Sequence, residues 1–310
     1  PVKRARLRIA KAPFRFQERP RSTSRTALTP EPISNHVSVW GEGPIWHGDR
    51  LLYVDIEAHK IIAFTPSTGA EQIWNVGQRV GTVVPRAKGG LVWAGDDGFF
   101  FLDEATGVST AIADPEPGLP DNRFNDGKCD PQGRFWVGSI DEPRQPEAAL
   151  YRWDGREMTR QAGGITTSNG LAWSPDGSIL YWSDTRAHTI YAFDFDPVAG
   201  SLSSQRVFCR FEPRQALQSL STYRGRPDGA AMDCEGCYWV AMYEGQCLLR
   251  LTPEGAIERR VALPVRCPTM PCFGGPDLRT LYITTARHKR PAAELARMPW
   301  SGCVLQMQVD

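Results

Sequence analysis

The sequence RFNDGKCDPQGRFWVGSI occupies residues 123–140 and carries the clearest structural signals in the chain. Its DPQG segment (130–133) predicts a tight turn, because proline suits the second turn position and glycine adopts a positive φ without steric cost. The following RFWVG (134–138) is aromatic and β-branched, as is typical of a strand. The NDGK segment (125–128) places an amide, a carboxylate and an ammonium around one glycine. The stretch therefore predicts two short strands with a polar cluster, a unit too small to bury its own apolar face.

Similar units recur along the chain, each with a glycine-containing turn that leads into a strand with a central aromatic residue. The aromatic residues are Tyr53, Trp93, Trp136, Tyr181, Trp239 and Tyr282, which are 40, 43, 45, 58 and 43 residues apart. A period of about 40–50 residues with several short strands per repeat is typical of a β-propeller. The sequence therefore predicts an all-β fold, a six-bladed β-propeller with a central channel. The 58-residue interval leaves room for an insertion near residues 212–225.

The predicted propeller domain spans residues 36–310, and residues 1–35 form a basic N-terminal extension that we expect to be flexible. Residues 294–299 are compatible with a short helical turn. Residues 304–309, VLQMQV, alternate as a strand does. We expect this last strand to close the ring by pairing near the start of the domain, because closure removes an exposed sheet edge.

Charge is distributed unevenly. The chain carries 36 basic and 35 acidic residues, of which nine basic and one acidic residue lie within residues 1–29. Residues 30–310 therefore carry a net charge of −7, which is unfavourable for a nucleic-acid-binding surface and favourable for a cation and a neutral ligand. No apolar run reaches the ~18–20 residues of a membrane span, so neither nucleic acid nor membrane is an expected partner.

The basic N-terminal segment has three interpretations: a solvated extension, an Arg-rich transit-type peptide, or residues that belong to an upstream start. The eight cysteines show no disulfide-framework spacing. The pair Cys234 and Cys237 flanks a predicted turn and has no second CxxC partner. We therefore predict reduced thiols and a cytoplasmic protein.

Polar residues stand at the same phase of four repeats, each close to a glycine. They are Glu42, Asn125 or Asp126, Asn169 and Asp228. Equivalent positions in a propeller meet at one mouth of the central channel, so these side chains should converge. Oxygen ligands without histidine or cysteine suit Ca²⁺, Mg²⁺ or Mn²⁺, and Zn²⁺ stays open. Motifs for other chemistries are absent from the sequence: there is no GxSxG elbow, no P-loop and no GxGxxG between a strand and a helix.

Five segments in a fixed order resemble one family. They are GEGP (41–44), RFNDGK (123–128), SNGLA (168–172), PDG (227–229) and FGGPD (273–277). Together they resemble the senescence marker protein (regucalcin), gluconolactonase and luciferin-regenerating-enzyme family, over about residues 40–309. The resemblance implies a six-bladed propeller with one divalent metal ion, and hydrolysis of sugar lactones to aldonic acids.

Carried over position by position, the resemblance implies the metal ligands Glu42, Asn169 and Asp228. Arg123 and Asn125 match the substrate-contacting pair of the family. A second acidic substrate contact of the vertebrate members aligns with Pro143. Either Glu142 replaces that contact by a shift of one residue, or the distal hydroxyl groups of the sugar are recognised differently.

For catalysis, Asp228 is the candidate for proton transfer, and Asp126 and Asp184 are alternatives. Three functions stay open at this point: a metal-dependent sugar lactonase, a metal-dependent hydrolase of other esters or organophosphates, and a non-catalytic calcium-binding propeller. The Arg123–Asn125 pair favours an enzyme, because a metal buffer does not need a substrate clamp. We expect a monomer or a weak homo-oligomer that acts on a small-molecule lactone.

Overall fold

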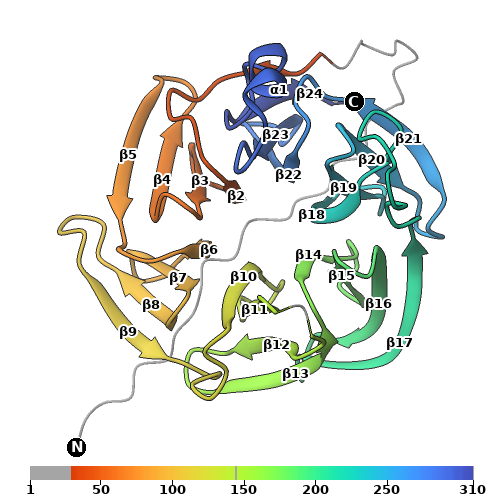
Figure 1. The fold of residues 1–310 in the computed structure, drawn as a ribbon. Helices are drawn as coiled ribbons and strands as arrows, with labels where there is room; N and C mark the ends of the chain where they lie inside the picture. Colours follow the sequence, from red (N-terminus) through yellow and green to blue (C-terminus); the bar gives the residue numbers. More distant parts are fainter. Residues whose placement is uncertain (1–28, 144, 310) are drawn as a thin grey trace, which may run out of the picture.

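The structure is a computed structural model that describes residues 29–143 and 145–309. These residues form six four-stranded sheets, arranged as blades around a common centre (Figure 1). The prediction of an all-β six-bladed propeller is therefore confirmed. Besides the strands, the described residues contain one short helix, α1 (Ala292–Arg297).

Each blade is an antiparallel sheet, and its four strands follow one another from the centre of the ring to the edge. The innermost strands are β2 (Gly41–His47), β6 (Val80–Pro85), β10 (Asn122–Cys129), β14 (Ser168–Trp173), β18 (Arg226–Met232) and β22 (Pro268–Gly274). The second strands are β3 (Arg50–Asp55), β7 (Leu91–Gly95), β11 (Phe135–Asp141), β15 (Ile179–Asp184), β19 (Tyr238–Tyr243) and β23 (Thr280–Thr285). The third strands are β4 (Lys60–Thr65), β8 (Gly98–Leu102), β12 (Ala148–Trp153), β16 (Thr189–Asp196), β20 (Cys247–Leu251) and β24 (Leu305–Gln308). The outer strands are β5 (Ala70–Asn75), β9 (Ser109–Ala113), β13 (Met158–Ile165), β17 (Ser201–Arg210), β21 (Ile257–Ala262) and β1 (Glu31–Pro32).

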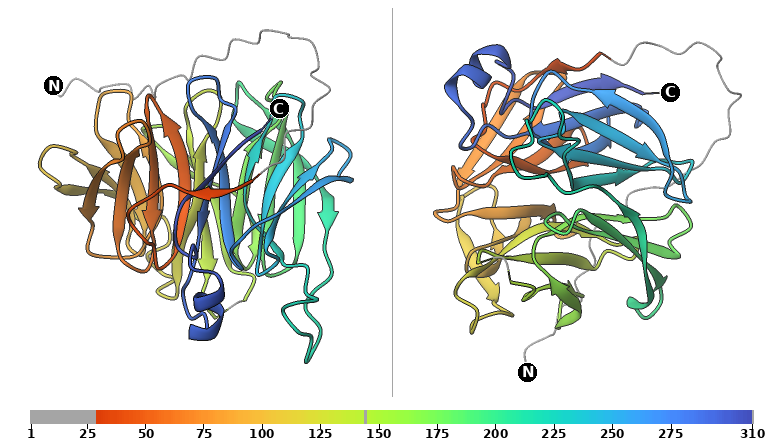
Figure 2. Two further views of the ribbon diagram at one scale, coloured as in Figure 1. Left: turned by 90° about the horizontal axis from the view of Figure 1, so that it is seen from above. Right: turned by 45° about the vertical axis from the view of Figure 1, so that its right-hand side comes forward.

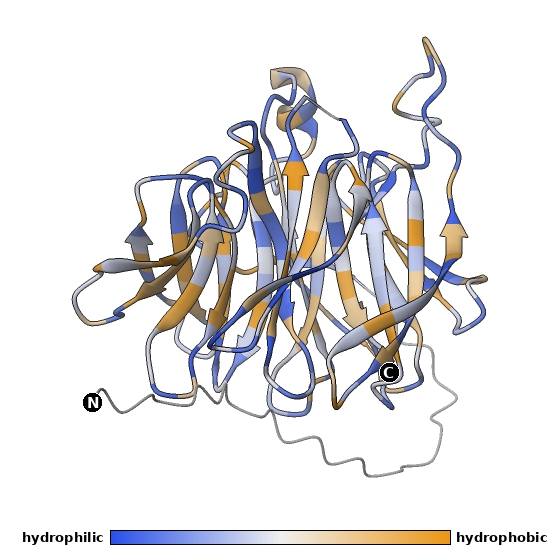
Figure 3. Cartoon of the chain, turned by 90° about the horizontal axis from the view of Figure 1, so that it is seen from below, coloured by the Kyte–Doolittle hydropathy of each residue, from blue (hydrophilic) through white to orange (hydrophobic). Residues whose placement is uncertain are grey.

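The six aromatic residues that revealed the repeat all lie in second strands and are buried. Aromatic contacts link one blade to the next: the ring of Trp136 lies 6.0 Å from that of Trp173, and the ring of Tyr181 lies 5.3 Å from that of Tyr238. The core is thus divided among the spaces between blades, because each sheet buries its apolar face against its neighbour. Figure 3 shows that apolar segments recur along the strands, whereas many of the connecting loops are hydrophilic.

The two ends of the described chain meet in one blade. Strand β1 pairs antiparallel with β24, where Glu31 faces Gln306 and Pro32 faces Leu305. This confirms the prediction that the last strand closes the ring near the start of the domain. Strand β1 lies inside the segment that the sequence assigned to the N-terminal extension. Residues 1–28 of that extension lie outside the described residues.

One face of the ring is elaborated. The connection between β17 and β18, residues 211–225, and the segment around α1 project from the same face (Figures 2 and 3). The long connection lies where the 58-residue interval predicted an insertion. The predicted helical turn near residue 294 is α1. In the described part of the chain, no helix is long and apolar enough to cross a membrane.

Candidate active site

The innermost strands carry the predicted site residues at irregularities in their pairing. The register between first and second strands shifts after Glu42, around Asn125, after Asn169 and around Asp228. Such bulges leave residues unpaired and turn their side chains away from the sheet. At the bulge after Asn169 the backbone needs a positive φ, and Gly170 provides it: its φ of 63° lies in the left-handed region that glycine adopts without steric cost.

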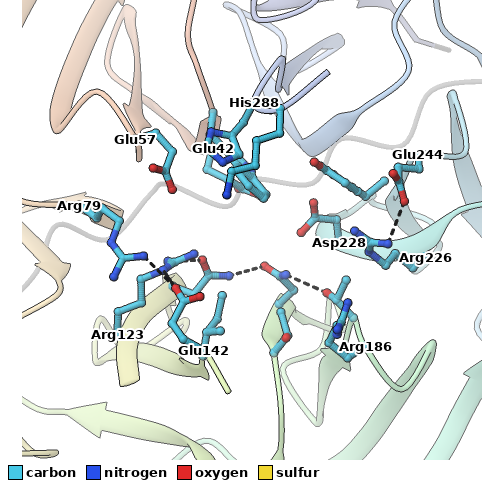
Figure 4. A pocket seen from close by; sticks show the side chains of 18 of the residues that line it. Glu42, Glu57, Arg79, Arg123, Glu142, Arg186, Arg226, Asp228, Glu244 and His288 are labelled. Atoms are coloured by element: carbon cyan, nitrogen blue, oxygen red, sulfur yellow. Dashed lines mark hydrogen bonds and ion pairs between the residues drawn. The ribbon is translucent and has the colours of Figure 1, made fainter. Parts of the chain in front are cut away.

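These strands frame a pocket of about 540 Å³, within the usual range for small-molecule sites. It is lined by Trp40, Glu42, Glu57, Arg79, Arg123, Asn125, Ile140, Asp141, Glu142, Thr167, Asn169, Thr185, Arg186, Arg226, Asp228, Tyr243, Glu244, His288, Lys289 and Arg290. Figure 4 shows their side chains converging from several blades. The six residues that the sequence assigned first to metal, substrate and catalysis are among them, whereas the alternatives Asp126 and Asp184 are not. The sequence therefore located the pocket, and the role of each residue stays a prediction.

A chain of hydrogen bonds crosses the floor of the pocket (Figure 4). Arg123 Nη1 donates to Asn125 Oδ1 at 3.0 Å, and Asn125 Nδ2 donates to Asn169 Oδ1 at 2.9 Å. Asn169 Nδ2 in turn donates to Thr185 Oγ1 at 2.8 Å. The chain fixes the orientation of both amides, so that the carbonyl oxygen of Asn169 keeps one lone pair for a further partner.

Two carboxylates face this chain without a cationic partner of their own. Glu42 and Asp228 are 3% and 5% exposed, and neither takes part in an ion pair among the described residues. Burial, followed by the charges of Asp228 and Asp126, raises the pKa of Glu42 well above its ordinary value. Burial also raises the pKa of Asp228, against the effect of Arg226. Both carboxylates are therefore short of positive charge.

A third buried carboxylate lies next to them. Asp126 is 1% exposed and accepts a hydrogen bond from the backbone N–H of Leu171, but its Oδ1 has no hydrogen-bond partner among the described residues. Burial raises its pKa, although the ammonium of Lys128 acts in the opposite direction. Lys128 Nζ donates to the carbonyl of Ala230 at 2.8 Å. Asp126 does not line the pocket, but its charge contributes to raising the pKa of both Glu42 and Asp228.

The donor set fits a divalent cation. Among residues 29–143 and 145–309, no three His, Cys, Asp or Glu side chains are grouped closely enough to hold a metal ion by themselves. The predicted set is of another kind, two carboxylates (Glu42, Asp228) and one amide oxygen (Asn169). The uncompensated burial of the two carboxylates is what a bound cation would relieve. All-oxygen donors favour a hard cation.

Glu142 also lines the pocket, but in company that the sequence did not predict. Its Oε1 accepts from Arg123 Nε at 3.0 Å and from Arg79 Nη1 at 2.8 Å. Partial burial acts to raise the pKa of Glu142, but the two guanidinium groups outweigh it and hold that pKa below its ordinary value. In this structure the carboxylate is thus held by two arginines.

Asp184, an alternative proton-transfer residue, does not reach the pocket. Its carboxylate accepts hydrogen bonds from the backbone N–H groups of Thr166 and Thr167 and from the Thr166 hydroxyl. It fixes the segment that enters β14, and its place at the end of β15 is that of a turn-capping residue.

Residues 40–287 match the SMP-30/Gluconolactonase/LRE-like region. The chain belongs to this family. It is 39% identical over 279 residues to 6-deoxy-6-sulfogluconolactonase of Pseudomonas putida, an alignment that covers 88% of this chain and 92% of that protein. It is 37% identical over 274 residues to regucalcin of Danio rerio, with coverage of 86% and 90%. The crystal structure of a regucalcin from Agrobacterium tumefaciens, described as a calcium-binding protein, has the same fold with a TM-score of 0.83, 24% identity and coverage of 91% and 94%.

Within this SMP-30/gluconolactonase-like site, sequence reasoning missed the residues that surround the predicted ones. Arg226 and Arg290 both bind the carboxylate of Glu244, each at 2.9 Å. Trp40 stacks on Tyr243 with 5.6 Å between ring centroids. These residues lie in loops or at strand ends, and they meet only in the folded ring. Trp40 carried a usable signal, because it directly precedes an inner strand.

Proposed function

We propose that this chain is a sugar lactonase that hydrolyses aldono-lactones to aldonic acids with one divalent metal ion. The observation that carries the proposal is the convergence of Glu42, Asn169 and Asp228 on one pocket beside the Arg123–Asn125 pair. A metal-binding site alone does not need a buried guanidinium next to its ligands. The gluconolactonase-type family and the lactonase activity in the name of the Pseudomonas putida relative support the same reaction.

Glu42, Asn169 and Asp228 would hold the metal ion. When bound, a divalent cation supplies polarisation of the ester carbonyl and stabilises the negative charge that develops on its oxygen. The protein contributes rigidity to this site, because the bulges and the chain of amide hydrogen bonds fix the donors before the substrate arrives.

The remaining residues bind the substrate and move protons. Arg123 is 6% exposed and is fixed by Asn125, so its guanidinium can donate to substrate oxygens and orient the ring. Asp228 accepts a proton from the attacking water at a carboxylate oxygen. The water oxygen bonds to the acyl carbon, the bond from that carbon to the ring oxygen breaks, and the ring oxygen takes up the proton that Asp228 had accepted and leaves as a hydroxyl group. One lactone and one water thus give one aldonic acid.

The test is pH-monitored hydrolysis of a panel of aldono-lactones by metal-stripped protein, with Ca²⁺, Mg²⁺, Mn²⁺ or Zn²⁺ added back one at a time. We expect acid release that depends on the metal. The variant Asp228→Asn should lose activity and bind metal more weakly by calorimetry. Asp194→Asn, in an exposed ion pair with Arg206, is the control of equal charge change. Full activity of Asp228→Asn would refute the role of Asp228, and silence across the panel would refute the lactonase.

A further inference from the structure

Two arginines on one wall of the pocket share a single anion. Arg79 Nη1 and Arg123 Nε donate to the same oxygen, Oε1 of Glu142, at 2.8 and 3.0 Å. The two guanidinium groups come from different blades, since Arg79 directly precedes β6 and Arg123 belongs to β10. Figure 4 shows this group on the opposite side of the pocket from Asp228. The shared anion Glu142 therefore lies across the pocket from Asp228, whereas Arg123 is linked through Asn125 to Asn169.

Both arginines are fixed in place from behind. Arg79 Nε donates to Asp96 Oδ1 at 2.9 Å, and the backbone N–H of Arg79 donates to Asp96 Oδ2 at 3.0 Å. Arg123 Nη1 donates to the carbonyl of Phe124 at 3.3 Å and to Asn125 Oδ1. Each guanidinium is thus held by part of its donors, and one further donor of each is aimed at the same oxygen, Glu142 Oε1. Such an arrangement is a preorganised anion-binding site.

Glu142 is the exposed member of the group. Its side chain is 46% exposed, whereas that of Arg123 is 7% exposed. It lies just after β11, and no partner of its Oε2 is found among the described residues. Water can solvate a carboxylate this exposed as it moves away, whereas the buried guanidinium of Arg123 then needs another anion in its place.

We propose that Arg79 and Arg123 bind an anionic group of the substrate in place of the Glu142 carboxylate. The inference rests on the proposed lactonase function and names its substrate class: lactones that carry a carboxylate, sulfonate or phosphate at the end remote from the reacting carbonyl. Such groups present two or three oxygens and match two converging guanidinium groups better than the single oxygen of Glu142 does. Arg79 is then the residue that determines specificity, and Glu142 is an internal anion that closes the pair when no substrate is bound.

The test compares two substrates that differ only at the remote end. D-glucaro-1,4-lactone carries a carboxylate where D-glucono-1,4-lactone carries a hydroxymethyl group. We expect the metal-loaded wild-type protein to favour the charged lactone in kcat/KM by about tenfold or more, which is the worth of a charge-assisted hydrogen bond. The preference should arise mainly in KM, because the contact is remote from the reacting carbonyl and is the same in the ground and transition states.

Three variants identify the residues responsible. Arg79→Gln should lower the charged-to-neutral ratio of kcat/KM about tenfold. Glu142→Gln should raise that ratio, because it removes the competing anion and keeps the shape of the side chain. Arg206→Gln removes the same charge from an exposed ion pair outside the pocket and should leave the ratio unchanged.

The opposite results are equally clear. A wild-type ratio of one or below, or a ratio that Arg79→Gln does not change, overturns the inference while the lactonase stands. The same holds if Glu142→Gln lowers kcat/KM for the neutral lactone and leaves the charged one unaffected, because Glu142 would then recognise hydroxyl groups. If neither lactone is hydrolysed, the proposed function is refuted, and the inference falls with it.

Discussion

Replacing Asn125 by alanine tests whether the amide chain on the pocket floor serves catalysis. The Asn125 amide is 5% exposed and makes three hydrogen bonds: it accepts from Arg123 and donates to the carbonyl of Ser168 and to Asn169 Oδ1. A buried hydrogen bond contributes about 1 kcal/mol, and one to a charged group about 1.5–3 kcal/mol. Water from the pocket can replace some of these contacts. We therefore expect the free energy of unfolding to fall by about 2–3 kcal/mol.

The effect on activity should be larger than the effect on stability suggests. Without Asn125, the guanidinium of Arg123 and the amide of Asn169 each lose one of the partners that fix their direction. A misplacement of about 1 Å at a reacting group can cost a hundredfold in rate. We expect Asn125→Ala to lower lactonase kcat/KM about a hundredfold, measured by acid release at saturating metal, while urea denaturation reports its stability.

The same strand offers a matched control. Asn122 Nδ2 donates one hydrogen bond, to Glu116 Oε2 at 3.0 Å, and Asn122 does not line the pocket. Asn122→Ala should lower the free energy of unfolding by about 1–2 kcal/mol and leave kcat/KM unchanged. If Asn125→Ala keeps more than half of the wild-type activity, or if both variants lose activity equally, the amide chain does not position the site.

Two further predictions concern the framework of the site. Burial acts to raise the pKa of Asp55, but hydrogen bonds from His36 and from two backbone N–H groups before β2 outweigh it and lower that pKa. The resulting stability is present above the ordinary carboxyl pKa of about 4 and is lost as the pH falls through the lowered value. The melting temperature of the wild type should therefore fall between pH 7 and pH 2, and that of Asp55→Asn should fall less. If the melting temperatures of both proteins fall by the same amount, the prediction is contradicted. At Gly138 an added Cβ would lie 1.6 Å from Ser168 Oγ, so Gly138→Ala should destabilise by more than 2 kcal/mol in urea denaturation. Gly118→Ala, with nothing within 4 Å of its Cβ, should change stability by about 0.5 kcal/mol or less, and equal effects of the two would refute the steric argument.

The fold was predictable because each repeat can be recognised from a short local sequence pattern. A turn glycine followed by a strand aromatic recurs in every blade, and residues as far apart as Tyr53 and Tyr282 occupy the same place in their sheets. Polar residues such as Glu42 and Asp228 stood out because the packing of an apolar inner strand does not require a carboxylate. Because the six repeats are arranged in a ring, residues at equivalent positions of different repeats lie at the same end of the channel. The convergence of these polar side chains on one mouth could therefore be predicted from their positions within the repeats.

Contacts between blades were not predictable in this way. Glu142 entered as a substrate contact, and nothing in its neighbourhood indicates that Arg79, 63 residues earlier, binds it. Lys128 likewise donates to the carbonyl of Ala230, which lies 102 residues further along the chain. Such pairs form because long side chains reach across the ring. The sequence around one partner contains no signal that identifies the other.

Part of the missing information was nevertheless present in the repeat. Trp40, Arg79 and Thr167 each directly precede the innermost strand of their blade, and all three line the pocket. In three of the six blades the residue before the inner strand thus lines the pocket, whereas Asp121, Gly225 and Cys267 of the other three do not. Aligning that position across the repeats would have made Arg79 a candidate for the pocket wall, and a cation there indicates that one wall of the pocket is suited to an anion.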